Sequence, residues 1–237
     1  EHNAHCVSKA FPAEQQRVRL LSFNIQVGIS TSAYRHYVTR SWKHLLPHQE
    51  RFQNLEKIGF LLSDYDIVAL QEADGGSLRS GNSNGLLSRL QPQKLEDHPL
   101  PGPAGRGAIL AQIGEGPEAI AVVSMHLALG TRARNRQLGY IHEIVSDYQH
   151  VVLMGDMNTH ADNLIRNSPL SGLNLRAAQT EATFPSWKPQ RCLDHILISS
   201  ELEIDNMCVL PIPISDHLPV AMDIILPKAI ATDPLPQ

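Results

Sequence analysis

The amino-acid sequence predicts an α/β fold formed by one domain. The chain has 237 residues, 42% of them hydrophobic, which is enough apolar material for a sizeable core. Segments with the periodicity of strands alternate with segments of helical periodicity along the whole chain. No Gly/Ser-rich linker, internal repeat or low-complexity tract separates them. We assign the domain to residues 18–228, with terminal tails at 1–17 and 229–237.

The first third of the chain predicts a strand, a helix and a second strand. Apolar and polar residues alternate over residues 18–27, which is the period of a strand, and Asn24 lies near its end. Apolar residues recur at helical spacing over 49–63. A turn and a continuous apolar run over 64–72 predict a buried strand that ends in Glu72.

The remainder of the chain continues this alternation. Two strands, 108–113 and 119–129, flank a turn that contains two glycines and a proline. A helix is predicted at 131–148 because apolar residues again recur at helical spacing. Three further buried strands are predicted at residues 151–155, 193–199 and 218–226.

Polar residues gather where these strands begin or end. The set comprises Asn24, Glu72, His126, Asp156 and Asn158 after strands, and Asp194, Asp216 and His217 at strand starts. Strand ends on one edge of a sheet border the same crevice, so we expect these side chains to converge. One such residue alone usually indicates a turn. Acids, amides and imidazoles together form the set that a single reaction requires.

That reaction is the metal-assisted attack of water on a phosphate ester. A hard cation held by one or two carboxylates neutralises charge on the phosphate oxygens, and Mg²⁺ prefers oxygen ligands. Glu72 and Asp216 are the natural residues to hold it. The sequence therefore favours a divalent-metal-dependent hydrolase.

The same reaction needs a base for the water and a cation for the transition state. We expect Asp156 to be the base, with neighbouring carboxylates raising its pKa above the ordinary value near 3.9. Extended backbone would point Asn158 to the same side, where it fixes the water or the phosphate. His217, oriented by Asp194, would be held as an imidazolium.

Six motifs resemble, in order, those of the endonuclease/exonuclease/phosphatase superfamily, the group of DNase I, AP endonucleases and neutral sphingomyelinases. They lie at residues 22–26 (SFNIQ), 70–72 (LQE), 124–127 (SMHL), 155–158 (GDMN), 193–196 (LDHI) and 215–220 (SDHLPV). The resemblance is to a bacterial-type member. It implies a four-layer α/β sandwich, in which two mixed β-sheets pack face to face and are flanked by helices. It also implies a phosphoesterase that depends on Mg²⁺ or Mn²⁺.

The resemblance also implies roles for individual residues. It places Asn24, Glu72 and Asp216 at the metal, His126 at the scissile phosphate, Asp156 as the base, Asn158 as the residue that positions the water, and Asp194 as the partner of His217. Arg106 fits a family position near the phosphate. These assignments agree with the chemistry expected from the residues themselves.

Two further residues are candidates for substrate binding. Arg132 belongs to a basic cluster, with Arg134 and Arg136, at the start of the helix at 131–148. The helix macrodipole disfavours cations there, so the cluster indicates a bound anion. Trp187 lies in a rigid turn that could present it to the cleft. The alternatives, a solvated helix face for the arginines and simple packing for Trp187, stay open.

The sequence departs from the family between Glu72 and the family-like motif at 83–89 (SNGLLSR). Family members carry a longer interval there, usually with a helix. Either this segment is absent from the protein, or a loop near Gly81 and Asn82 has been left out of the sequence. We favour the second interpretation because a helix layer is hard to lose without exposing apolar sheet.

The composition limits the substrate and the location. Lys and Arg number 20 against 24 Asp and Glu, a net charge of −4, which disfavours a general DNA-coating role. We expect a phosphodiesterase or nuclease. The alternatives are hydrolysis of a phospholipid head group or a phosphomonoester, or a catalytically silent binding module. The three cysteines and the absence of a transmembrane segment favour a cytoplasmic monomer, although a signal peptide removed earlier would leave no trace.

Overall fold

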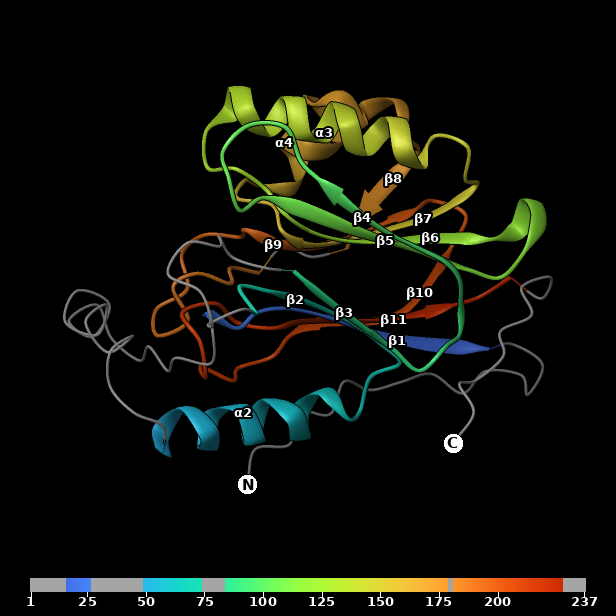
Figure 1. Ribbon diagram of the computed structural model, residues 1–237. Coiled ribbons are helices and arrows are strands. Elements are labelled where there is room, and N and C mark those ends of the chain that lie inside the picture. The colour runs from blue at the N-terminus through green and yellow to red at the C-terminus, as the bar shows by residue number, and fades with distance from the viewer. Residues whose placement is uncertain (1–15, 27–48, 74–83, 179–180, 228–237) are drawn as a thin grey trace.

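Two β-sheets packed face to face form the centre of the molecule, with helices on both outer faces (Figure 1). The computed structural model describes residues 16–26, 49–73, 84–178 and 181–227. The helices are α2 (Gln49–Leu62), α3 (Thr131–Val145) and α4 (Ala161–Arg166), with short 3₁₀ helices at Gly116–Glu118 and Pro169–Gly172. Helix α2 covers one sheet, and α3 and α4 cover the other (Figure 1). The predicted four-layer α/β sandwich is confirmed.

The first sheet has five strands in the order β10-β11-β1-β2-β3. They are β10 (Glu203–Val209), β11 (Val220–Ile225), β1 (Arg17–Asn24), β2 (Ile67–Gln71) and β3 (Gly85–Ser88). Strand β1 is parallel to β2 and antiparallel to β11, so the sheet is mixed.

The second sheet has six strands in the order β4-β5-β6-β7-β9-β8. They are β4 (Pro92–Pro99), β5 (Gly107–Ile113), β6 (Ile120–His126), β7 (His150–Asp156), β9 (Asp194–Ser199) and β8 (Leu175–Ala177). Strands β6 and β7 are parallel, and β7 and β9 are antiparallel. The end of β7 therefore lies beside the end of β6 and the beginning of β9.

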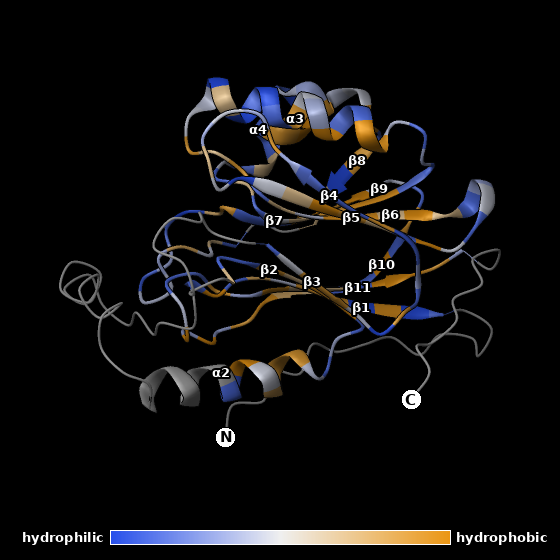
Figure 2. Cartoon of the chain, in the orientation of Figure 1, coloured by the Kyte–Doolittle hydropathy of each residue, from blue (hydrophilic) through white to orange (hydrophobic). Residues whose placement is uncertain are grey.

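Apolar side chains fill the space between the sheets. Leu20, Ile67, Val122, Val152 and Met222 lie there, each at most 3% exposed. Two more clusters lie on the outer faces, one beneath α3 and one beneath α2. Hydrophobic residues accordingly dominate the strands, while the outer side of α3 is hydrophilic (Figure 2). Burial on both faces makes the central strands largely apolar, and the polar residues predicted for the site lie near the ends of these strands.

The predicted strand at 18–27 is shorter in the structure. Strand β1 ends at Asn24, and Gln26 has a left-handed backbone with φ of 43°. Val27 lies outside the described residues, as do the tail residues 1–15 and 228–237. The strand predicted at 119–129 ends at His126, and the helix predicted at 131–148 ends at Val145. For these elements the predicted types were right, and the errors lie at the boundaries.

Strands β4, β8 and β10 and helix α4 were not predicted from the sequence. Strand β4 is at one edge of its sheet, and most of its residues are exposed or half-buried. Strand β10 is also an edge strand and is mostly half-buried. Edge strands lack the continuous apolar run of a buried strand, so periodicity alone does not reveal them.

The short interval after Glu72 joins two adjacent strands. Strands β2 and β3 are antiparallel neighbours, and Leu70 pairs with Gly85. A direct connection can join such a pair. Residues 74–83, which include Gly81 and Asn82, lie outside the described residues. Within the described part of the chain, no helix combines the length and the apolar character needed to cross a bilayer.

Candidate functional site

Three predicted residues lie side by side at one end of the six-stranded sheet. The pairing of β6 with β7 sets His126 opposite Asp156, and the pairing of β7 with β9 sets Asp156 opposite Asp194. Asp156 shares its face of β7 with Val152 and Met154, which pack between the sheets. All three polar residues are at most 2% exposed. The strand register therefore brings them together, as the sequence analysis expected.

The five-stranded sheet contributes Asn24 and Glu72 to the same place. Asn24, the last residue of β1, donates its Nδ2 to Asp156 Oδ2 at 3.3 Å and to Glu72 Oε1 at 3.3 Å. Its Oδ1 accepts the backbone N–H of Gln26 at 3.2 Å. Glu72 directly follows β2 and has a left-handed backbone with φ of 55°. As placed, Asn24 presents its amide nitrogen to the carboxylates, so an oxygen ligand from Asn24 would require the amide to turn.

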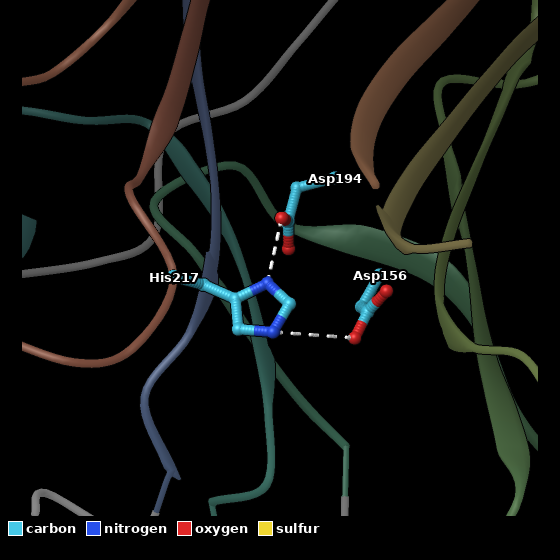
Figure 3. Close-up of side chains that lie close together, drawn as sticks. All are labelled: Asp156, Asp194 and His217. Atoms are coloured by element: carbon cyan, nitrogen blue, oxygen red, sulfur yellow. Dashed lines mark hydrogen bonds and ion pairs between the residues drawn. The ribbon is translucent and has the colours of Figure 1, made fainter. Parts of the chain in front are cut away.

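His217 and Asp194 form a buried pair beside Asp156 (Figure 3). His217 Nδ1 lies 2.7 Å from Asp194 Oδ2, and its Nε2 lies 3.9 Å from Asp156 Oδ2. The imidazole therefore bridges two carboxylates, and its ring packs against Phe184 with centroids 4.8 Å apart. The expected pairing of Asp194 with His217 is present in the geometry.

Thr183 completes this pair and was missed from the sequence. Its hydroxyl donates to Asp194 Oδ2 at 2.5 Å, and the side chain is fully buried. The same hydroxyl oxygen accepts the backbone N–H groups of Leu193 and Asp194 at 3.3 and 3.4 Å. Thr183 lies outside the regular strands, so no periodicity marks it.

Asp156 is surrounded by donors. His126 Nε2 lies 3.4 Å from its Oδ2, and the backbone N–H of Asn158 donates to its Oδ1 at 3.0 Å. The Asn158 side chain turns elsewhere and donates its Nδ2 to Leu127 O at 2.9 Å. The expectation that extended backbone would point Asp156 and Asn158 to the same side was wrong, because Asn158 has a left-handed backbone with φ of 52°.

The imidazoles set the charge state of this centre. Burial alone would raise the pKa of Asp156, but the hydrogen bond from His126 and the charge of His217 lower it to about 2. Burial opposes the charged form of His217, but Asp194 and Asp156 raise its pKa to about 10. The expectation that carboxylates would raise the pKa of Asp156 was wrong, because its nearest partners are imidazoles. At neutral pH an imidazolium lies between two carboxylates.

Asp216 and Glu72 lie close enough to repel each other. Burial raises the pKa of Asp216, the charge of His217 opposes this, and the charge of Glu72 raises it further. Asp216 is 6% exposed, and its Oδ1 accepts the Ser215 hydroxyl at 3.2 Å. A buried carboxylate with a second one nearby favours a cation between them.

A second group of side chains could also hold a metal. Asp156, Asp194 and His217 each offer one ligand atom, and these atoms lie within 4.8 Å of one another. Asp194 Oδ2, however, already receives both Thr183 Oγ1 and His217 Nδ1. Mg²⁺ prefers oxygen over imidazole nitrogen. The hydrogen-bonded arrangement therefore fits a proton-holding pair better than a magnesium site.

The two arginines predicted for substrate binding differ in position. Arg106, half-buried just before β5, lies near the site: burial lowers its pKa, and the charges of Asp156 and Glu72 oppose that change. Arg132 is exposed in the first turn of α3. Arg106 is therefore the arginine that the structure brings to the carboxylates.

Trp187 is half-buried next to a residue that is tied to the site. Ser186 donates its backbone N–H to Asp216 O at 2.7 Å and its hydroxyl to Ser215 O at 2.6 Å. The turn that carries Trp187 is therefore fixed to the loop that carries Asp216.

Comparisons with known proteins agree with this fold. No curated protein matches the sequence. An endonuclease/exonuclease/phosphatase from Beutenbergia cavernae has a TM-score of 0.67 at 17% identity, covering 89% of this chain and 72% of that one. The Bacteroides thetaiotaomicron mannosyl-6-phosphatase Bt3783 has a TM-score of 0.63 at 15% identity, covering 87% and 99%. ANGEL2, a 2′,3′-cyclic phosphatase, has a TM-score of 0.62 at 15% identity, covering 90% and 97%.

The sequence profile of the Endonuclease/Exonuclease/phosphatase family matches residues 21–217, which contain all the predicted site residues. This match spans most of the chain and includes strands of both sheets. The chain therefore belongs to the endonuclease/exonuclease/phosphatase family, whose members are phosphoester hydrolases.

Proposed function

We propose that the chain is a Mg²⁺- or Mn²⁺-dependent phosphodiesterase, with nuclease activity as the favoured form. The observation that carries this proposal is the surroundings of Asp156. One buried carboxylate lies within hydrogen-bond or ion-pair distance of Asn24, His126 and His217. Such a centre can orient a water molecule and meet the charge that develops on a phosphate.

Glu72 and Asp216 are the residues proposed to hold the metal. Both are carboxylates, and burial together with the nearby charge of Glu72 raises the pKa of Asp216, although the charge of His217 opposes this. A bound cation would neutralise charge on the phosphate oxygens. Asn24 becomes a third ligand only if its amide turns, so we assign it first to the orientation of Glu72 and Asp156.

The proposed roles of the remaining residues follow from their hydrogen bonds. Asp156 accepts the proton of the attacking water, and the Asn158 N–H fixes its other oxygen. His217 donates its Nε2–H towards the phosphate, while Asp194 holds Nδ1. His126 contacts a phosphate oxygen. Because the pKa of Asp156 is low, it orients the water and accepts the proton only as bond formation acidifies that water.

The charge of the site favours a diester over a monoester. The formal charges come from Glu72, Asp156, Asp194 and Asp216 as carboxylates and from Arg106 and the His217 imidazolium as cations. Four negative and two positive charges leave −2, which one divalent cation neutralises. A phosphodiester then adds one negative charge, whereas a phosphomonoester dianion adds up to two. The diester is therefore accommodated with less repulsion.

A phosphomonoester or a phospholipid head group is the second candidate. A sugar phosphatase and a cyclic phosphatase share the fold, so the same scaffold accommodates different leaving groups. A steep loss of activity with salt would favour a polymeric nucleic acid, and a flat dependence would favour a small ester or a lipid.

The test is hydrolysis of bis-p-nitrophenyl phosphate, p-nitrophenyl phosphate, plasmid DNA and sphingomyelin with Mg²⁺, Mn²⁺ or EDTA. The variant is Asp156→Asn, and the matched control is Asp97→Asn on the exposed face of β4. We expect metal-dependent cleavage that falls about 10²–10⁴-fold in Asp156→Asn. The control should retain full activity. Silence of the wild-type protein on all four substrates would instead favour a binding module, and equal rates for Asp156→Asn would remove Asp156 from the reaction.

A further inference from the structure

We propose that Arg134 is a positioning residue that fastens together two loops, the one that follows His126 and the one that carries Asn158. The inference rests on the proposed function because these loops directly follow His126 and Asp156, two residues of the proposed hydrolytic centre. The arginine itself lies behind the centre, in the first turn of α3, and its side chain is 7% exposed.

The guanidinium of Arg134 donates to groups on both loops. Its Nη1 donates to Ala128 O at 3.2 Å and to Leu129 O at 2.7 Å, both in the loop that follows His126. The same nitrogen donates to Asn158 O at 3.2 Å, in the loop that follows β7. Its Nη2 donates to Thr131 Oγ1 at 3.3 Å. One buried side chain thus joins two segments that are otherwise separate in sequence.

This position is unfavourable for a cation unless the contacts stabilise it. The macrodipole of α3 disfavours positive charge in the first turn, and burial removes hydration from the guanidinium. Arg132 and Arg136, its neighbours in the basic cluster, are exposed. The planar fork of arginine, with its several N–H donors, suits a set of carbonyl acceptors. The interpretation of Arg134 as part of an anion-binding cluster is therefore replaced by a role in holding backbone.

Asn158 transmits this restraint to the centre. Its N–H donates to Asp156 Oδ1, its side chain donates to Leu127 O, and its carbonyl accepts from Arg134. Its left-handed backbone, with φ of 52°, is strained and needs surrounding contacts to persist. Leu127 N in turn donates to Asp156 O at 2.9 Å. Loss of the guanidinium would release Asn158 and loosen the hydrogen bonds on Asp156.

The kinetic test compares Arg134→Met and Arg134→Lys with Glu143→Gln, which removes an exposed charge elsewhere on the same helix. The assay is metal-dependent hydrolysis of bis-p-nitrophenyl phosphate. We expect kcat of Arg134→Met to fall on the order of 10–100-fold with a smaller change in KM, because misplacement of catalytic groups affects the reacting geometry more than binding. Arg134→Lys should recover part of the loss, and Glu143→Gln should match the wild type. A kcat of Arg134→Met equal to that of the wild type would overturn the proposal.

Amide hydrogen exchange tests the same proposal without an activity assay. In Arg134→Met the backbone amides of residues 127–130 and 157–159 should exchange faster, while those of β7 keep their protection. Glu143→Gln should leave all of them unchanged. Unchanged exchange at both loops, or faster exchange spread evenly over the fold, would overturn the proposal. Because this readout needs no substrate, it separates a failure of this inference from a failure of the proposed function.

Discussion

Replacement of Gly155 by alanine should disrupt both the fold and the centre. Gly155 lies in β7 directly before Asp156 and has φ of 146°, a backbone conformation that side chains of L residues rarely adopt. A Cβ at this position would lie 1.9 Å from Met125 O in the neighbouring strand β6. The contact is with backbone, so no side-chain rotation can relieve it. The two strands must separate, or Asp156 must move.

The size of the effect follows from these two features. An unfavourable backbone conformation costs about 1–3 kcal/mol, and overpacking costs about 1–3 kcal/mol. We therefore expect Gly155→Ala to lower the free energy of unfolding by about 2–6 kcal/mol. Gly139 in α3 is the matched control, because no atom lies within 4 Å of an added Cβ. Gly139→Ala should stabilise the protein by about 0.5–1 kcal/mol, since alanine is the better helix former.

Urea unfolding, followed by circular dichroism, measures both variants against the wild type. The slope of the free energy against urea should stay the same in all three proteins, because the folded surface changes little. A Gly155→Ala protein within about 0.5 kcal/mol of the wild type would refute the reasoning, since it would fall in the range of neutral surface changes. So would a Gly139→Ala protein that is destabilised more than Gly155→Ala.

Three further predictions concern the charged groups of the site. The pKa of His217 is raised to about 10, so its contribution to stability is present below about pH 6.5 and is lost as pH rises towards 10. In EDTA, the unfolding free energy of the wild type should fall between pH 7 and 9 more steeply than that of His217→Gln, by up to about 1.4 kcal/mol per pH unit, and equal slopes would contradict this. Thr183→Val removes the hydroxyl donor to Asp194 and should destabilise the protein by about 1.5–3 kcal/mol in urea unfolding; an unchanged midpoint would show that this hydrogen bond contributes nothing. Asp216→Asn should weaken Mn²⁺ binding in calorimetry by at least about ten-fold while Asp97→Asn does not, and equal affinities would place the metal elsewhere.

The sequence predicts the centre well because its residues lie at the ends of buried strands. Asp156 and Asp194 follow or begin apolar runs that can only be strands inside the sheet. Once those strands pair, the register alone sets Asp194 opposite Asp156 and His126 on the other side. Convergence of these residues is thus a consequence of topology. Periodicity alone does not predict this topology. The family resemblance of the motifs does.

The sequence does not predict contacts that depend on irregular backbone. Thr183 reaches Asp194 from a loop, and its hydrogen bond is visible only when the chain is folded. The left-handed backbone of Asn158 turns its side chain to Leu127, which no pattern of residue types indicates. Arg134 was read as a solvent-facing or anion-binding cation because its position in the helix says nothing about the carbonyls that surround it.

Charge states are similarly a property of the folded site. The motifs contain several carboxylates that we expected to lie close to Asp156 in the folded protein. We therefore expected a raised pKa for Asp156. The fold instead brings His126 and His217 next to Asp156, and the pKa of Asp156 falls.

Secondary structure at the edge of a sheet is equally hard to predict. The exposed residues of edge strand β4 carry no apolar pattern. Interactions between distant segments decide these properties.

The most direct test of the account is the rate of bis-p-nitrophenyl phosphate hydrolysis by wild-type protein and Asp156→Asn, both in Mg²⁺ and at matched folded fraction. The central claim is that Asp156 drives metal-dependent attack on a phosphodiester. The account predicts turnover by the wild type that EDTA abolishes, and a kcat/KM for Asp156→Asn lower by about 10²–10⁴-fold. Equal values of kcat/KM for the wild type and Asp156→Asn would contradict the account.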